Sequence, residues 1–361
     1  MRINSAFWKD KRVFVTGHTG FKGAWLTAML NEMGAKTAGF ALSPEPKDRP
    51  SLYAAGIKPN TTDTIGDIRD LAKVEKALTE FKPDIIFHMA AQALVLPSYE
   101  DPIGTFATNV MGTVHILMSG LKCPSLKVLV NITSDKCYEN REWIWPYREN
   151  DPMGGHDPYS ASKGAAEITA SSLRRSFFNE RKISLPSVRA GNVIGGGDWA
   201  LHRIVPDLMQ SFAKGEAAPI RNPQAIRPWQ HVLEPLRAYL MIAEAGWADP
   251  LATSKGWNVG PDSDAARPVL QLAEKAVQVW GDKARLDVSP VANKKHEATF
   301  LKLDTNQIRG ELGWRPLLNF DDSLEWTVRW YRDFYKGTAA DTLCKKHVQD
   351  YLKLNDLKSA P

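Results

Sequence analysis

Short apolar runs alternate with amphipathic segments along most of the chain. Short runs with apolar residues at 11–16, 36–41, 64–68, 83–89, 126–132, 184–188 and 257–260 predict strands, and the run at 11–16 predicts a buried one. Apolar residues recur with helical spacing between them, at 24–33, 71–81, 105–120, 207–214 and 233–245. Strands that alternate with helices predict an α/β fold, a Rossmann-type doubly wound parallel sheet. Ligands of such sheets bind at the carboxyl ends of the strands.

A glycine-rich turn joins the first predicted strand to the first predicted helix. Glycines without side chains let the backbone approach a pyrophosphate, and the helix N-terminus offers free N–H groups to the anion. We therefore predict dinucleotide binding by Gly17, His18, Thr19, Gly20, Phe21, Lys22 and Gly23. A glycine-rich turn that binds no ligand is the alternative.

The end of the second predicted strand departs from the usual dinucleotide pattern. An acidic residue normally stands there and holds the adenosine ribose. This chain has Phe40 to Ser43 and then Glu45, followed by Lys47 and Arg49. The sequence therefore does not choose between NAD and NADP at this position.

A hydroxyl, a carboxylate and an amine leave the end of one strand as Ser134, Asp135 and Lys136. Tyr159 and Lys163 follow, and their spacing of four residues places them on one face of a helix. A nearby ammonium favours the phenolate, so we expect the pKa of Tyr159 to be lowered and the phenol to act as a base near neutral pH.

Other predicted strand ends carry residues suited to surround a cofactor. Asp67 and Ile68 are a plausible contact to an adenine ring, and Ala90 and Ala91 are small enough to leave room. With these residues, the motifs from Gly17 to Lys163 resemble the extended short-chain dehydrogenase/reductase family over roughly the first 200 residues. The resemblance also covers His88 and Asn109.

The resemblance implies roles that spacing alone does not. Tyr159 would be the acid/base, Lys163 its partner and a ribose ligand, and Ser134 a hydrogen-bond partner of the sugar oxygen. NAD would be the cofactor, with Asn109 among the residues of its site. His88 is more typical of a structural residue than of a catalytic one.

Within that family, three stretches are similar to the CDP-glucose 4,6-dehydratases: the glycine turn with His18, the run 134–138 and the run 191–199. This similarity implies oxidation at C4, loss of water across C5 and C6, and hydride return to C6, for deoxysugar and O-antigen biosynthesis. A neutral Lys136, with its pKa lowered by burial or nearby cations, could take the C5 proton. A protonated Asp135 could donate to the departing C6 hydroxyl. An ion pair at the surface is the structural alternative.

The last third of the sequence offers ligands for a diphosphate. Asn192 stands where the family places a phosphate ligand. The guanidinium fork donates two parallel hydrogen bonds to phosphate oxygens, and Arg203, Arg221 and Arg227 are the candidates, with Arg227 the best match. Solvated surface arginines are the alternative. We expect a Rossmann domain at 1–190 with a return segment at 233–259, and a smaller C-terminal α/β substrate domain at 191–361.

Composition excludes several other classes of protein. The 361 residues are 43% hydrophobic and 24% charged, which is typical of a globular protein. The net charge of +5 does not indicate nucleic acid, and no apolar run is long enough to span a bilayer. The N-terminus lacks a signal-peptide core, and three widely spaced cysteines indicate a reducing compartment without disulfides or a metal cluster.

We therefore predict a cytoplasmic, homo-oligomeric enzyme, a dimer or tetramer, that acts on the nucleotide sugar CDP-glucose and uses neither metal, membrane nor nucleic acid. Three alternatives stay open. A C4 epimerase would leave the product mass unchanged, and a redox-sensing binding protein would lack the Tyr/Lys pair. An NADPH reductase, suggested by Lys47 and Arg49, would consume its cofactor.

Overall fold

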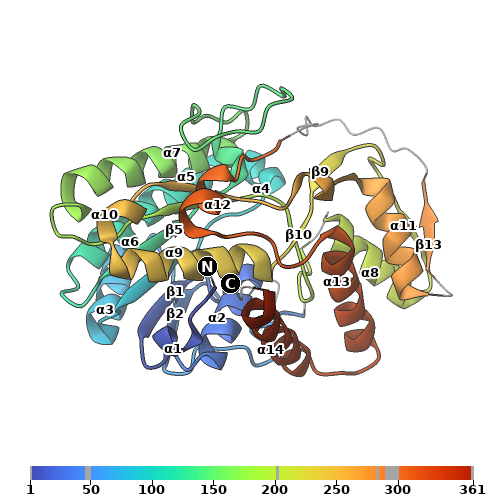
Figure 1. The fold of residues 1–361 in the computed structure, drawn as a ribbon, viewed down its shortest axis with the longest axis horizontal. Coiled ribbons are helices and arrows are strands. Elements are labelled where there is room, and N and C mark those ends of the chain that lie inside the picture. Colours follow the sequence, from blue (N-terminus) through green and yellow to red (C-terminus); the bar gives the residue numbers. More distant parts are fainter. Residues whose placement is uncertain (1, 45–49, 201–202, 282–283, 289–300, 359–361) are drawn as a thin grey trace.

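A computed structural model describes residues 2–44, 50–200, 203–281, 284–288 and 301–358 (Figure 1). Glu45, Lys47 and Arg49, which bear on the choice between NAD and NADP, lie outside the described residues. Within the described residues, no helix has the length and apolar character needed to cross a membrane. The same residues contain no cluster of three or more His, Cys, Asp or Glu side chains that could hold a metal ion.

Seven parallel strands form the central sheet, in the order β11-β6-β5-β4-β1-β2-β3. Their bounds are β1 (Arg12–Thr16), β2 (Lys36–Ala41), β3 (Thr62–Ile65), β4 (Ile85–His88), β5 (Val128–Ile132), β6 (Ser187–Ala190) and β11 (Gly256–Val259). The strand order reverses between β1 and β4, which places the ligand crevice at their carboxyl ends. The predicted doubly wound sheet is confirmed.

Helices cover both faces of the sheet (Figure 1). One face packs against α3 (Leu71–Phe81), α6 (Gly112–Leu121) and α7 (Pro158–Leu173), and the other against α2 (Phe21–Glu32) and α9 (Leu233–Ala248). Strands β1, β4 and β5 are buried because helices cover both faces of the sheet. Their sequences are therefore mostly apolar rather than alternating between apolar and polar residues.

Several boundaries differ from the sequence prediction. Helix α2 begins at Phe21 rather than 24, so the end of the glycine turn is already helical. The third strand ends at Ile65, which leaves Asp67 and Ile68 in the following loop. The helix predicted at 105–120 runs through α5 (Pro102–Phe106), a π-helical turn η1 (Ala107–Met111) and α6.

The remaining strands pair outside the central sheet, and the remaining helices are distributed over the fold. Three two-stranded sheets pair β7 (Val193–Ile194) with β10 (Gln230–His231), β8 (Ala217–Pro219) with β13 (Arg285–Asp287), and β9 (Ile226–Pro228) with β12 (Ala266–Pro268). The other helices are α1 (Ser5–Trp8), α4 (Val95–Glu100), η2 (Asp135–Cys137), η3 (Arg174–Phe178), α8 (Ile204–Lys214), α10 (Pro250–Thr253), η4 (Ser263–Ala265), α11 (Val269–Trp280), α12 (Asn306–Leu312), α13 (Phe320–Tyr335) and α14 (Ala340–Lys358).

Two segments from the second half of the chain return to the central sheet. Strand β11 pairs with β6, and helix α9 contacts β5. Helix α14 packs against α2, and Asn355 accepts a hydrogen bond from the N–H of Ile3 at 3.2 Å. The C-terminus is therefore anchored on the N-terminal part of the fold, while the predicted domain division stays a prediction.

Candidate active site

Close packing of α7 on the segment after β5 brings the two predicted catalytic groups together. Gly164 makes this approach possible, because a Cβ there would lie 2.7 Å from the carbonyl oxygen of Gly154 and 3.1 Å from that of Cys137. A side chain at 164 would push α7 away from η2. Cys137 is fully buried and burial raises its pKa well above the ordinary value, so it is a packing residue.

Tyr159 and Lys163 are both buried on α7, and the side chain of Ser134 hydrogen-bonds the Tyr159 hydroxyl. Burial raises the pKa of Tyr159 to about 12, against opposing effects of Ser134 and the charge of Arg203. The expectation of a lowered pKa is therefore wrong for this geometry, because desolvation outweighs the hydrogen bond from Ser134 and the charge of Arg203. Burial lowers the pKa of Lys163 to about 8, and Lys22 lowers it further.

Asp135 is buried against the backbone of Gly191. Its Oδ1 accepts from Ser134 Oγ at 3.0 Å, and a Cβ at Gly191 would lie 2.7 Å from its Oδ2. Burial raises the pKa of Asp135, while Lys136 and Ser134 oppose this effect. Burial and the raised pKa favour a proton donor over a solvated surface ion pair. Lys136 follows Asp135 on η2 and is only partly buried.

Lys22 reaches the same site from the glycine turn. Its Nζ donates to the Tyr239 hydroxyl at 2.9 Å, and burial lowers its pKa to about 8 with a further lowering by Arg203 and an opposing effect of Asp135. The mutual effects of Lys22, Lys163 and Arg203 place three cations around the catalytic groups. Such a cluster suits an anionic ligand. The sequence assigned Lys22 only to the dinucleotide turn and missed its place beside Asp135.

Two glycines of the turn are required by close backbone approaches. Gly17 has a φ of +76°, and a Cβ there would lie 2.8 Å from the backbone N of Ala90. A Cβ at Gly23 would lie 2.1 Å from the carbonyl oxygen of Gly17. Gly20 differs, because its Cβ would meet nothing nearer than 3.4 Å. The fold itself therefore leaves space at Gly20, the N-cap residue of α2, where no side chain caps the helix.

Other predicted residues of the turn have partners within the fold. His18 is fully buried between β2 and β3, where Nε2 contacts Asp63 Oδ1 at 2.9 Å and burial lowers its pKa. Thr19 Oγ1 donates to the Leu42 carbonyl at 2.8 Å. Phe21 packs beside Gly195, because a Cβ added at Gly195 would lie 3.2 Å from the ring of Phe21.

The loop residues predicted to contact adenine differ in their surroundings. The Asp67 carboxylate is paired with Arg69 at 2.6 Å, and this hydrogen bond lowers the pKa of Asp67. Ile68 is buried, and a Cβ at Gly112 would lie 2.5 Å from its Cδ1. Ile68 thus belongs to the core between the loop and α6.

The loop after β4 is held by hydrogen bonds from Asn109. Its Oδ1 accepts from the N–H of Gln92 at 2.8 Å, and its Nδ2 donates to Ser162 Oγ at 2.8 Å. Asn109 therefore fixes the loop that carries Ala90 and Ala91 against α7. His88 is buried between Thr16 at 2.8 Å and Thr113 at 3.0 Å, and burial lowers its pKa to about 3, as expected of a structural residue.

The candidate diphosphate ligands lie on different elements. Asn192 follows β6, next to Gly191, and Arg203 Nη1 is paired with Asp198 Oδ2 at 2.8 Å at the start of α8. Arg221 is paired with Asp207 at 2.6 Å. Arg227 lies on β9, and its Nη1 donates to the Ile226 carbonyl at 2.9 Å. Of the arginines, Arg203 is the one with an electrostatic effect on Tyr159.

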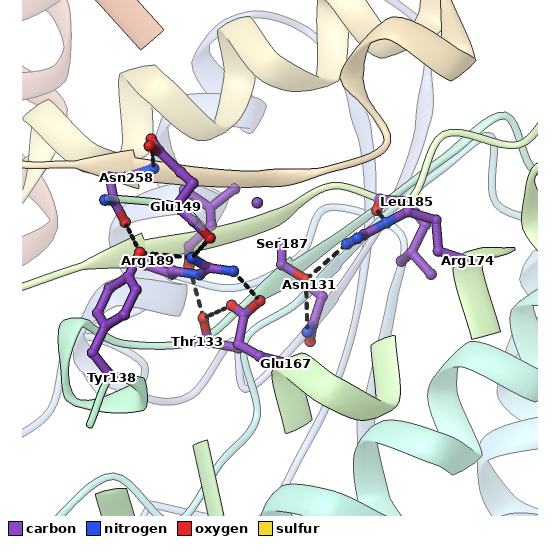
Figure 2. Close-up of polar contacts among 12 residues, drawn as sticks. Asn131, Thr133, Tyr138, Glu149, Glu167, Arg174, Leu185, Ser187, Arg189 and Asn258 are labelled. Carbon is purple, nitrogen blue, oxygen red and sulfur yellow. Dashed lines mark hydrogen bonds and ion pairs between the residues drawn. The ribbon is translucent and has the colours of Figure 1, made fainter. Parts of the chain in front are cut away.

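Sequence reasoning missed a buried polar network behind the site (Figure 2). It contains Thr133, Glu167 and Arg189, which are 7%, 4% and 5% exposed. Two signals were available in the sequence. Glu167 follows Lys163 by four residues on the same helix, and Arg189 directly follows a predicted strand, where a buried charge needs a partner.

Comparison with known proteins identifies related sequences and folds. The family model described as GDP-mannose 4,6 dehydratase matches residues 14–327. A CDP-glucose 4,6-dehydratase from Salmonella typhimurium is 49% identical over 97% of this chain and 98% of its own. A dTDP-glucose 4,6-dehydratase from Streptomyces antibioticus is 28% identical over 89% of this chain and 92% of its own.

Two solved structures show the same fold. An epimerase from Methanothermobacter thermautotrophicus has a TM-score of 0.78 and 21% identity, covering 92% of this chain and 95% of its own. The dTDP-glucose 4,6-dehydratase of Streptomyces venezuelae, solved with NAD bound, has a TM-score of 0.75 and 24% identity, covering 89% and 97%. Since the family model spans most of the chain and a relative matches nearly all of it, the chain belongs to the 4,6-dehydratase family.

Proposed function

We propose that the protein is an NAD-dependent hydro-lyase that converts CDP-D-glucose to CDP-4-dehydro-6-deoxy-D-glucose. The observation that carries the proposal is the convergence of Ser134 and Asp135 on Tyr159 at the carboxyl end of β5. The phenol and the hydroxyl suit oxidation of the sugar, and the carboxyl with a raised pKa suits proton donation in the elimination. The Salmonella typhimurium relative, which carries the name of this activity, supports the choice of CDP-glucose.

The glycine turn fits NAD. The free space at Gly20 and the uncapped start of α2 suit a pyrophosphate, which the helix N-terminus attracts. NAD, when bound, would take up the hydride of C4 and return it to C6 of the same sugar. We assign its binding to residues 17–23, Asp67, Ile68, Ala90, Ala91, Asn109, Tyr159 and Lys163.

Tyr159 accepts the proton of the C4 hydroxyl in this proposal. Its phenol must lose its own proton first, and burial opposes this. Ser134 supplies a hydrogen bond and Arg203 a positive charge, and both favour the phenolate. Lys163 lies one turn from Tyr159 and also binds the ribose.

Asp135 and Lys136 carry the elimination. The C4 ketone makes the C5 proton acidic, and the neutral amine of Lys136 would take that proton and return it to C5 when the hydride is added at C6. Asp135, whose raised pKa favours the protonated form, donates its proton to the C6 hydroxyl, which leaves as water. Asn192, Arg203, Arg221 and Arg227 hold the substrate diphosphate, with Arg203 beside the reacting groups.

Mass spectrometry tests the reaction and the nucleotide together. The protein and NAD are incubated separately with CDP-glucose, dTDP-glucose, UDP-glucose and GDP-mannose. The expected result is loss of one water from CDP-glucose alone, with no net NADH. Unchanged mass with altered sugar stereochemistry would indicate the C4 epimerase instead, and unchanged mass and stereochemistry with all four would refute the proposal.

We further propose a cytoplasmic homo-oligomer, a dimer or a pair of dimers, that serves deoxysugar and O-antigen biosynthesis. Apolar side chains are exposed on the adjacent helices α5, η1 and α7 at Ile103, Phe106, Met111 and Ile168. A second copy of the chain would cover them. Light scattering after chromatography should show a dimer or larger species that Ile103→Glu weakens, and a monomeric wild-type protein would refute this assembly.

A further inference from the structure

The buried network behind the active site joins three chain segments that border the catalytic groups. Glu167, on α7, is its centre. Oε1 accepts from the hydroxyl of Thr133 in a short hydrogen bond, and Oε2 is paired with Arg189 Nη2 at 2.8 Å (Figure 2). A single carboxylate on the catalytic helix thus contacts the residue after β5 and a residue of β6.

Each of these three segments leads directly to the site. Thr133 immediately precedes Ser134, and Glu167 is one helical turn beyond Lys163. Arg189 is two residues before Gly191, whose backbone lies against Asp135. The distance between Tyr159 and Ser134 therefore depends on how α7 lies against the ends of the two strands.

Arg189 extends the network to the far side of the same strand ends. Its Nη1 donates to the Tyr138 hydroxyl at 2.6 Å and to the Glu149 carbonyl at 2.9 Å. The Tyr138 hydroxyl donates in turn to Asn258 Oδ1 on β11 at 2.7 Å. Tyr138 closely follows Asp135 and Lys136, so this stretch is held at both ends, by Thr133 and by Tyr138.

A buried ion pair fills space less favourably than apolar side chains do, because both charges lose their hydration. Glu167 and Arg189 are nine-tenths or more buried, and a buried ion pair can often be replaced by apolar side chains without loss of stability. Hydrogen bonds have directions that apolar contacts lack. Thr133 and Arg189 approach the two oxygens of Glu167 separately, which fixes the orientation of the carboxylate relative to both strands.

We propose that Thr133, Glu167 and Arg189 form a positioning unit that aligns Ser134 and Asp135 with Tyr159 and Lys163, so that oxidation and elimination act on one placement of the sugar. None of the three contacts the substrate in this proposal, which rests on the proposed dehydratase function. Small displacements matter, because a shift of about 1 Å can cost about 100-fold in rate.

Thr133 allows a matched test. Thr133→Val keeps the shape and removes the hydroxyl that contacts Glu167, whereas Thr133→Ser keeps the hydroxyl and removes a methyl group. Thr327→Val is the control, because Thr327 is a fully buried threonine of α13 that donates to the Ser323 carbonyl at 2.8 Å. Each substitution changes one group of a buried threonine, and the melting temperature of each variant is measured so that loss of stability can be compared with loss of turnover.

Turnover should fall in Thr133→Val by more than any loss of stability accounts for. On CDP-glucose, Thr133→Val should lower kcat by about 10- to 100-fold with KM changed less than about threefold, as for loss of alignment rather than of binding. Thr133→Ser and Thr327→Val should retain kcat within about threefold. Wild-type kcat in Thr133→Val, or losses in all three variants that follow melting temperature, would overturn the proposal.

A second measurement separates this proposal from the proposed function. Hydrogen exchange of the cofactor-free protein, followed by mass spectrometry, should become faster for a peptide spanning 134–138 in Thr133→Val but not in Thr327→Val. If the wild type dehydrates none of the nucleotide sugars, the proposed function fails while this exchange result still tests the network. Unchanged exchange at 134–138 would refute the positioning role in either case.

Discussion

Lys163→Met should stabilise the cofactor-free protein at neutral pH while it abolishes turnover. Lys163 is 6% exposed, and burial lowers its pKa to about 8 from the ordinary 10.5. At about 1.4 kcal/mol per pH unit, holding the charged amine in the fold costs roughly 3 kcal/mol at pH 7. Met keeps much of the apolar stem without the charge, so we expect a gain of about 2–3 kcal/mol at pH 7.

The pH dependence of this gain follows from the direction of the shift. Below pH 8 the amine is charged in both the folded and the unfolded protein, and the full cost is present. Between about pH 8 and 10.5 the folded protein releases the proton first, so the unfolded state binds more protons and wild-type stability rises with pH. The advantage of Lys163→Met should therefore shrink steadily over this range.

Urea unfolding at pH 7, 8, 9 and 10 measures the difference between the two proteins. Lys353→Met is the control, since Lys353 is exposed on α14, where removal of a surface ion pair costs little stability. A Lys163→Met protein that is less stable than the wild type at pH 7, or an advantage that does not change with pH, would refute this electrostatic reasoning.

Three further predictions concern other groups. Burial raises the pKa of Glu244 to about 7, so its contribution to stability falls as pH rises from about 4.5 to 7. Glu244→Gln should exceed the wild type by about 2 kcal/mol at pH 8, a figure reduced for its partial exposure, and should equal it near pH 4.5 in thermal unfolding. Gly191→Ala should lower kcat by about tenfold or more in the dehydration assay, because its Cβ would lie 2.7 Å from Asp135 Oδ2, and a wild-type kcat would contradict the placement of Asp135. Gly20→Ala should keep the melting temperature within a few degrees but weaken NAD binding in a fluorescence titration, whereas Gly23→Ala should prevent folding, since its Cβ would lie 2.1 Å from the Gly17 carbonyl oxygen. Equal melting temperatures for the two glycine variants would argue against this account.

The sequence was sufficient for the order of elements and the identity of the central motifs. Continuous apolar runs predicted β1, β4 and β5 because a parallel sheet is buried on both faces. Glycines next to a predicted strand located the turn before α2. The four-residue spacing of Tyr159 and Lys163 placed both on one face of α7, as the structure has them.

Electrostatics at the site could not be predicted from spacing. The sequence suggested that Lys163 lowers the pKa of Tyr159, but burial raises it to about 12. Spacing along one helix shows which side chains are neighbours. It does not show how much solvent the rest of the fold removes, and desolvation is the larger effect here.

Contacts between distant segments were likewise decided only by the tertiary structure. Lys22 comes within electrostatic range of Asp135, and Glu167 joins Thr133 to Arg189, across separations that no local pattern encodes. The sequence determined which groups are available and on which strand ends and helices they stand, because periodicity and turn residues act locally. The packing of α7 against β5 and β6 decided which of these groups meet, because burial and hydrogen-bond geometry depend on the whole fold.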